Sequence, residues 1–163
     1  EEKVEKNFLD LLEKNQKIIH KICRIYSNEE GYKDLFQEIV IQLWKSYSSF
    51  KGESKFTTWM YSVSLNTAMS LFRKVKKHET KINIELVQDK IKHDEINDDD
   101  EIKVKKMYQA IHQLNDVDKA LIMMYLDDKD YSEISRILGI TEGNARVKMN
   151  RARNKLKQLI KNR

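Results

Sequence analysis

Apolar side chains recur at helical spacing through most of the first half of the chain. The recurrence predicts a helix over about 5–26, a second over about 32–47 and a third over about 56–77. Gly31 interrupts the pattern between the first two, and a polar stretch at 48–55 precedes the third. Three such helices can bury one face each against the others, so we expect a first small helical domain over residues 5–78.

The segment 79–103 differs in character from what precedes it. It is polar, has weak periodicity and contains the acidic run Asn97-Asp98-Asp99-Asp100-Glu101. Such a charge density cannot bury enough apolar surface to order itself, so the segment is predicted to be a flexible acidic linker. The alternative for part of it is the solvated end of a helix.

Helical spacing resumes after this segment and continues almost to the end of the chain. It predicts a helix over 104–114, an apolar stretch at 121–125, a short helix at 131–137 and a final helix at about 142–161. We therefore expect a second small helical domain over residues 104–163.

The composition indicates an all-α fold. The 163 residues include no proline and only four glycines, whereas residues that favour helices are frequent. The single cysteine, Cys23, excludes an internal disulfide and is typical of a reducing cytoplasm. There is no run of about 18 apolar residues and no signal-like pattern at the start, so we expect a cytoplasmic protein without a membrane span.

The junction between the short helix and the final helix has the pattern of a helix-turn-helix. Ile134 and Ile137 fall on one face of the short helix, and Gly139 can adopt the positive φ that a turn between two crossing helices requires. Thr141 is a good N-cap for the helix that follows. The sequence therefore predicts that the helix at 142–161 is a DNA-recognition helix.

The final helix divides its residues as a recognition helix must. Ala145, Met149, Ala152 and Leu156 form an apolar stripe for docking on the scaffold. From Gly143 to Arg163 the chain has eight Lys or Arg and no acid, in a protein of net charge +5. Such basic side chains can bind the phosphates of DNA and the edges of its bases. The alternative is a surface helix whose charges are only solvated. The predicted contacts with duplex DNA are Asn144, Arg146, Val147, Lys148, Asn150, Arg151 and Arg153.

Three strings of residues resemble a known family. The string Gly143-Asn-Ala-Arg-Val-Lys-Met-Asn-Arg-Ala-Arg-Asn-Lys-Leu156 resembles region 4 of extracytoplasmic-function (ECF) sigma factors, which belong to the sigma-70 family. Asp34-Leu-Phe-Gln37-Glu38, followed by Leu43-Trp44, resembles region 2.2. Phe50, Phe56-Thr-Thr-Trp59-Met60, Asn66 and Arg73-Lys74 resemble the segment that melts and reads the promoter's minus-ten element.

The resemblance implies an alternative RNA polymerase sigma factor that directs promoter recognition and transcription initiation. Region 2.2 would bind the coiled coil of the largest subunit of core RNA polymerase through Asp34, Gln37 and Glu38. The loop 50–57 would hold a base flipped out of the non-template strand, and Asn66 would help to read it. Region 4 would read the minus-thirty-five element of promoter DNA. The resemblance also implies control by a cognate anti-sigma factor.

The residues around the loop fit contact with melted DNA, which needs aromatic faces for stacking and cations for the backbone. The predicted contacts with single-stranded DNA are Lys51, Lys55, Phe56, Trp59, Tyr61, Asn66, Arg73 and Lys74. For Phe56 and Trp59 the alternative is a place in the helical core, because aromatic residues at helical spacing are more often core than base platforms.

No pattern for catalysis, a cofactor or a metal is present, so we expect a protein that is not an enzyme. His20 and Cys23 lie three apart on one helix, but a metal site needs further ligands and no second cluster accompanies them. Two other functions remain open. One is a helix-turn-helix regulator that binds duplex DNA without polymerase, and the other is a protein-interaction adaptor or decoy for an anti-sigma factor.

Overall fold

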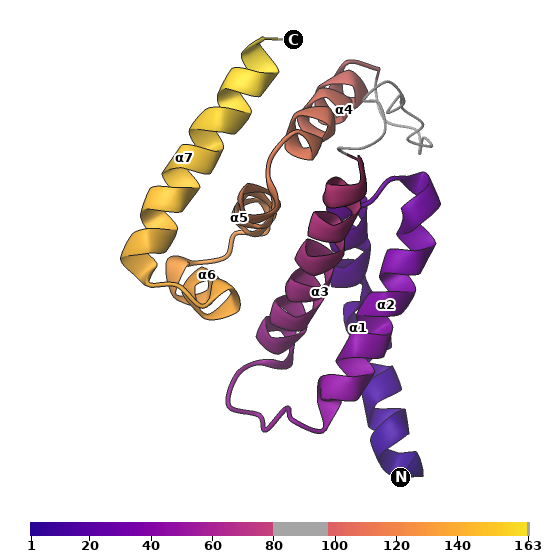
Figure 1. Cartoon of the computed structure of the whole chain (residues 1–163). Coiled ribbons are helices and arrows are strands. Elements are labelled where there is room, and N and C mark those ends of the chain that lie inside the picture. The colour runs from indigo at the N-terminus through magenta and orange to yellow at the C-terminus, as the bar shows by residue number, and fades with distance from the viewer. Residues whose placement is uncertain (80–97, 163) are drawn as a thin grey trace.

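The computed structural model describes residues 1–79 and 98–162, and all the regular elements in those residues are helices (Figure 1). The first half contains α1 (Glu2–Tyr26), α2 (Glu29–Tyr47) and α3 (Phe56–Glu79). The second half contains α4 (Asp98–His112), α5 (Asp116–Leu126), α6 (Tyr131–Leu138) and α7 (Glu142–Lys161). The predicted all-α class is confirmed.

Most helix bounds lie within about three residues of the predicted ones, but α2 begins at Glu29, so Gly31 lies in its first turn and does not separate the helices, and α5 begins at Asp116, before the predicted apolar stretch. The acidic segment differs as well. Residues 80–97 of the predicted linker lie outside the described residues, but α4 begins at Asp98 and includes the acids up to Glu101. The structure therefore shows the start of a helix for 98–103, in which Asp99 and Asp100 are exposed and Glu101 is half-buried. The physical reason is that carboxylates in the first turn of a helix are favoured by the partial positive charge of its N-terminus.

The first half is a three-helix bundle with its own apolar interior. Ile22 of α1, Ile39 and Leu43 of α2, and Met60 and Leu65 of α3 are all fully buried. The turn between α1 and α2 is closed by Asn28, whose side-chain oxygen accepts a hydrogen bond of 2.8 Å from the Gly31 backbone N–H. This cap satisfies one of the free N–H groups at the start of α2.

The second half is arranged around α5. Every residue of α5 from Asp118 to Met124 is buried, and α7 packs along it. A helix that is covered on nearly all sides must have neighbours on more than one side. Here those neighbours include α1 and α3 of the first half.

The two halves pack against each other and share one continuous core. Helix α3 contacts α5 and α6, and α1 contacts α4 and α5. Figure 1 shows α5 and α6 lying between α3 and α7. Among the residues that the structure describes, no helix is both long enough and apolar enough to cross a membrane.

Candidate nucleic-acid interface

The turn between α6 and α7 has the geometry expected of a helix-turn-helix. Gly139 ends α6 in the left-handed conformation, with φ 66° and ψ 35°. The next residue, Ile140, donates its backbone N–H to the Ser135 carbonyl at 3.2 Å, which closes the helix end. Thr141 then caps α7, because its hydroxyl accepts a hydrogen bond of 3.1 Å from the Asn144 N–H. Three local interactions therefore fix the direction in which α7 leaves the turn.

The rotation of α7 about its own axis is fixed by its buried stripe. Ala145, Met149 and Ala152 are essentially inaccessible, and they pack against the second half of the core. The side of the helix opposite this stripe points away from the protein, and the two flanks lie at its edge. Of the residues predicted to contact duplex DNA, five are exposed and two, Lys148 and Arg153, are half-buried. The exposed ones are Asn144, Arg146, Val147, Asn150 and Arg151.

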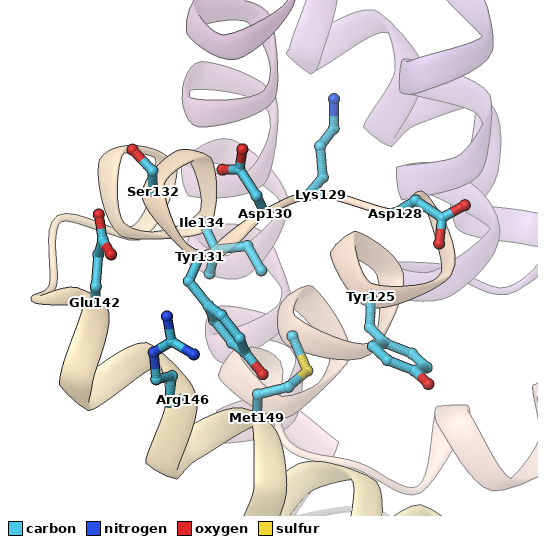
Figure 2. A pocket seen from close by; sticks show the side chains of 10 residues that line it. All are labelled: Tyr125, Asp128, Lys129, Asp130, Tyr131, Ser132, Ile134, Glu142, Arg146 and Met149. Carbon is cyan, nitrogen blue, oxygen red and sulfur yellow. The ribbon is translucent and has the colours of Figure 1, made fainter.

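Two arginines of α7 lie over tyrosine rings. The guanidinium carbon of Arg146 is 4.5 Å from the centre of the Tyr131 ring, and that of Arg153 is 4.5 Å from the centre of the Tyr125 ring. Figure 2 shows Arg146, Tyr131 and Tyr125 around a pocket of about 500 Å³ at this side of α7. Sequence reasoning did not assign a function to either tyrosine. Their pairing joins residues on different helices, and helical spacing gives no signal for such a contact.

The predicted polymerase-binding residues lie on a solvent-facing side of α2. Asp34 and Gln37 are exposed, and half-buried Glu38 accepts a hydrogen bond of 2.8 Å from the Gln42 side chain. The same face continues at Ile41, which is 45% exposed, and beside it lies Trp44, which is 43% exposed. These two large apolar side chains extend the polar group with a surface suited to a protein partner.

The loop 48–55 ends on a cluster of three aromatic rings. The ring centres of Phe50 and Phe56 are 5.8 Å apart, and those of Phe50 and Trp59 are 5.2 Å apart. All three rings are half-buried, so each packs on the others and still presents a face or edge to solvent. Lys51 and Lys55, on the loop itself, are exposed. The structure thus brings together cations and aromatic surface as the sequence predicted.

Helix α3 presents a row of predicted DNA contacts on one face. Trp59, Asn66 and Arg73 follow one another at intervals of seven residues, which is close to two helical turns. Asn66, Arg73 and the neighbouring Lys74 are exposed. Tyr61 does not join this row, because it lies on the opposite side of α3 and is only 1% exposed. In this arrangement its ring is part of the core and cannot stack on a base.

Acidic side chains of the second half bind donors on the first half. The Tyr61 hydroxyl donates to the Asp127 carboxylate, which also binds the Lys21 ammonium at 2.6 Å. Arg73 forms an ion pair with Asp116. Burial raises the pKa of the Tyr61 hydroxyl, and the hydrogen bond to Asp127 adds to the shift, so this phenol is protonated. Two of the predicted DNA contacts, Tyr61 and Arg73, are therefore occupied by acids of the chain itself.

A buried lysine lies at the junction of the halves. Lys119 of α5 is 1% exposed, and its ammonium lies 3.0 Å from the His112 carbonyl and 3.3 Å from the Ile25 carbonyl. It also lies 5.2 Å from the centre of the Phe72 ring. Burial, together with the nearby charge of Lys76, lowers the pKa of Lys119 to about 8. The ammonium thus bridges the C-terminal ends of α1 and α4, where backbone carbonyls favour a cation.

His20 and Cys23 have separate surroundings within the first half. The His20 ring stacks on Phe36 with ring centres 4.9 Å apart, and its Nδ1 lies 2.5 Å from the Tyr32 hydroxyl. Cys23 is fully buried, and burial raises the pKa of its thiol to about 12. Within the described residues, no group of three or more side chains is arranged to hold a metal ion.

Comparison with known families matches the two halves separately. Residues 11–78 match the family described as Sigma-70 region 2, and residues 105–156 match the family described as Sigma-70, region 4. The two matches stand in the order that the sequence motifs predicted. They include α2, the loop and most of α3 in one half, and the helix-turn-helix in the other.

Curated relatives match over nearly the whole chain. The ECF RNA polymerase sigma factor SigW of Bacillus subtilis is 25% identical over 167 residues, which cover 94% of this chain and 89% of the relative. The RNA polymerase sigma factor YlaC of the same organism is 28% identical over 147 residues, covering 88% of this chain and 85% of the relative. Among solved structures, the sigma factor RpoE from Bartonella quintana, in complex with the anti-sigma factor NepR, has the same fold. Its TM-score is 0.76 at 21% identity, with 96% of this chain and 98% of that chain covered.

The two matched regions and the helix-turn-helix place the chain in the sigma-70 family, whose members are regulatory DNA-recognition proteins. Within that family it belongs to the ECF group and is an alternative sigma factor of RNA polymerase. A helix-turn-helix regulator that acts without polymerase is not favoured, because such a regulator has no need of a region 2.

Proposed function

We propose that this sigma factor binds core RNA polymerase through α2 and reads promoter DNA with two further surfaces. The polymerase surface consists of Asp34, Gln37 and Glu38 together with exposed Ile41. The observation that supports it best is their common position on one solvent-facing side of α2, where the apolar side chain of Ile41 is 45% exposed. The partner would be the coiled coil of the largest polymerase subunit.

Charge reversal on α2 tests the polymerase surface. Asp34→Lys should weaken binding of the chain to core polymerase and lower run-off transcription in proportion. The matched control is Glu13→Lys, which changes the charge in the same direction, because Glu13 is an exposed residue of α1 outside this face. Equal binding of the parent chain and Asp34→Lys to purified core enzyme would disprove this assignment.

We propose that α7 binds the minus-thirty-five element as a duplex. This proposal is supported by the buried docking stripe of α7 together with its outward side chains. These include Lys, Arg and Asn residues, and the only acid of the helix is Glu142. Run-off transcription with core polymerase, followed by sequencing of the RNA 5′ ends, would report both activity and promoter sequence. An absence of promoter-specific initiation, together with an absence of core binding, would overturn the proposal.

The second DNA surface would bind the minus-ten element as a single strand. It comprises the exposed cations Lys51, Lys55 and Lys74, the half-buried rings of Phe56 and Trp59, and Asn66 on the same face of α3. Arg73 would join it once its ion pair with Asp116 is broken. Tyr61 is left out of the proposed surface, because it lies on the other side of α3 from Asn66 and Arg73.

We further propose that the halves, residues 5–78 and 104–163, separate when the protein binds polymerase. In the packed arrangement Asp116 and Asp127 occupy donors on the first half, and a partner that stabilises this arrangement would hold the protein inactive. The chemistry fits a cognate anti-sigma factor, as in the RpoE–NepR complex. Distances between labels on the two halves, measured in the free chain and on core polymerase, should lengthen on polymerase. Identical distances in the two states would refute the separation.

This function is regulatory and takes place where RNA polymerase acts, so we propose a cytoplasmic protein with no catalytic activity and no cofactor of its own. A chain that initiates transcription with purified core enzyme, DNA and nucleotides alone would support this. A requirement for any added cofactor would contradict it.

A further inference from the structure

The stripe that docks α7 on the core also sorts its outward residues into rows. At 100° per residue, Val147, Arg151 and Asn154 fall on the side opposite the buried Ala145 and Met149, and exposed Asn150 lies at the edge of that side, between Val147 and Arg146. Val147 is 49% exposed although it is apolar. This row is therefore the part of α7 that lies farthest from the protein and can enter a groove most deeply.

A second row lies along the flank that faces α5 and α6. It contains Arg146 and Arg153, which are seven residues apart and each lie over a tyrosine ring at 4.5 Å. Tyr131 is the first residue of α6, and Tyr125 lies in the last turn of α5. Figure 2 shows the Arg146 side chain next to Tyr131 at the edge of the pocket, with Met149 and Tyr125 beyond it.

The opposite flank behaves differently. Lys155 forms an ion pair of 3.1 Å with Asp118, which ties its ammonium to α5. Stacking on a ring leaves the N–H donors of Arg146 and Arg153 available. A ring below a guanidinium interacts with its face, whereas the N–H donors that bind phosphate lie in the guanidinium plane. Stacking also restricts the side chain before DNA arrives, which reduces the entropy lost on binding.

The usual docking geometry of a helix-turn-helix indicates which of the two rows of α7 faces the phosphate backbone and which faces the bases. The first helix crosses the phosphate backbone while the second lies in the major groove with its N-terminal residues at the base edges. Because Tyr131 begins α6, the flank of α7 beside it faces that same backbone. The row opposite the docking stripe faces the groove floor.

We propose that Tyr131 and Tyr125 are positioning residues that hold Arg146 and Arg153 for phosphate contacts, whereas Val147 and Asn150 read bases. An asparagine amide can pair with the N6 and N7 edge of adenine, and an apolar side chain can contact a thymine methyl group. The recognised element would thus include an A·T pair opposite each of these residues. The inference rests on the proposed binding of α7 to an upstream duplex element.

The test uses full-length chain with core polymerase on a library of duplex promoters randomised in the upstream element. Tyr131→Leu removes the π face but retains apolar volume, and Tyr131→Phe keeps the face as the matched control. We expect Tyr131→Leu to lower promoter use roughly 3- to 10-fold for all sequences alike, while Tyr131→Phe stays near the parent. Asn150→Ala should instead abolish the preference for adenine at one position.

The salt dependence of promoter binding gives a second readout that a merely structural role would not move. Arg146→Ala should reduce the slope of log affinity against log salt by about one phosphate contact, and Tyr131→Leu should reduce it in part. Asn150→Ala should leave the slope unchanged. Melting temperatures of all variants serve as the folding control.

The outcomes separate this inference from the proposal on which it rests. If the parent chain shows no preference in the upstream element, the assignment of α7 to duplex recognition fails and the inference fails with it. The parent can show a preference while Tyr131→Leu alters it at a single position, or while Asn150→Ala lowers promoter use for all sequences uniformly. Either result would mean that only the division of α7 into a base-reading row and a phosphate-binding row is wrong.

Discussion

The hydroxyl of Tyr61 donates a hydrogen bond to the carboxylate of Asp127, across the junction between the two halves of the chain. The same carboxylate binds Lys21 of α1. One acid at the end of α5 therefore holds two helices of the first half. The packing of the halves depends on a small number of such acids, and each can be changed separately.

Asp127→Asn should loosen the packed arrangement. The change removes the charge that attracts Lys21 and weakens the hydrogen bond to buried Tyr61. A hydrogen bond from a buried group to a charged one contributes roughly 1–3 kcal/mol. We expect the distance between spin labels placed at Ser48→Cys and Asn154→Cys, in a Cys23→Ala background, to become longer and broader. Pulsed electron spin resonance on the free chain measures it.

Asp128→Asn is the matched control for this prediction. Asp128 is the next residue, it is exposed, and it has a positive φ of 54° that Asn tolerates. Its distance distribution should equal that of the parent. A parent-like distribution for Asp127→Asn as well would show that this carboxylate does not hold the halves together.

The two glycines around the turn should respond to alanine in opposite ways. Gly139→Ala puts a side chain on a left-handed residue and should lower the free energy of unfolding by about 1–2 kcal/mol. Gly143→Ala lies in α7 with open space around it and should raise the free energy of unfolding by up to about 1 kcal/mol. Urea denaturation of both variants measures the pair, and a loss of stability at both positions would contradict the assigned turn.

The position of the docking stripe on α7 predicts unequal effects of truncation. Met149→Ala should lower the free energy of unfolding by about 2–4 kcal/mol, because the side chain is buried and a cavity would remain. Val147→Ala, two residues away and largely exposed, should change it by no more than about 0.5 kcal/mol. If thermal or urea unfolding gave equal losses, the rotation of α7 described above would be wrong.

Lys119 should make stability rise with pH on the alkaline side. Its pKa is about 8 in the folded chain and 10.5 in the reference state, so between these values the unfolded chain binds more protons than the folded one. The free energy of unfolding should therefore gain roughly 1 kcal/mol from this group between pH 8 and pH 9. Well below pH 8 both states are protonated and the gain is absent.

The measurement compares urea unfolding of the parent and Lys119→Met at pH 8 and pH 9. Contributions from the other groups, including the Cys23 thiol, are shared by both chains and cancel in the difference. The parent should gain about 1 kcal/mol relative to Lys119→Met over this step, whatever the stability of the variant at pH 8. Parallel pH dependences would mean that Lys119 keeps an ordinary pKa when folded.

The helices and the helix-turn-helix could be predicted because their signals are local. Spacing of apolar residues, one left-handed glycine and the Thr141 cap each act within a few residues. The composition of the acidic run at 98–101 predicts a linker, whereas its position at the start of α4 permits a helix. A carboxylate opposes a helix in its interior or at its C-terminus much more than in its first turn.

The relations between the halves could not be predicted from spacing. Tyr61 has the residue type and the neighbourhood of a DNA contact, yet it lies on the core side of α3 and is covered by the second half. Lys119 is of a charged residue type that is rarely buried, and its burial depends on carbonyls from α1 and α4. Arg146 was predicted to contact DNA, but the ring that orients it comes from α6. In each case a deciding partner comes from another helix or from the segment that follows it.

The buried ammonium of Lys119 limits the free energy by which the packed arrangement of the two halves is favoured. A charge held away from water is solvated again when the halves part, so separation recovers part of what packing loses. A junction of this kind acts as a threshold for any partner of the open form. If the packed form is favoured by about 3 kcal/mol, the apparent affinity of the chain for promoter DNA is roughly 150-fold lower than that of the open form. Binding of another partner to the open form can supply this free energy. Weak affinity of the free chain for DNA would then be a property of the equilibrium between packed and open forms, even where every DNA contact is intact.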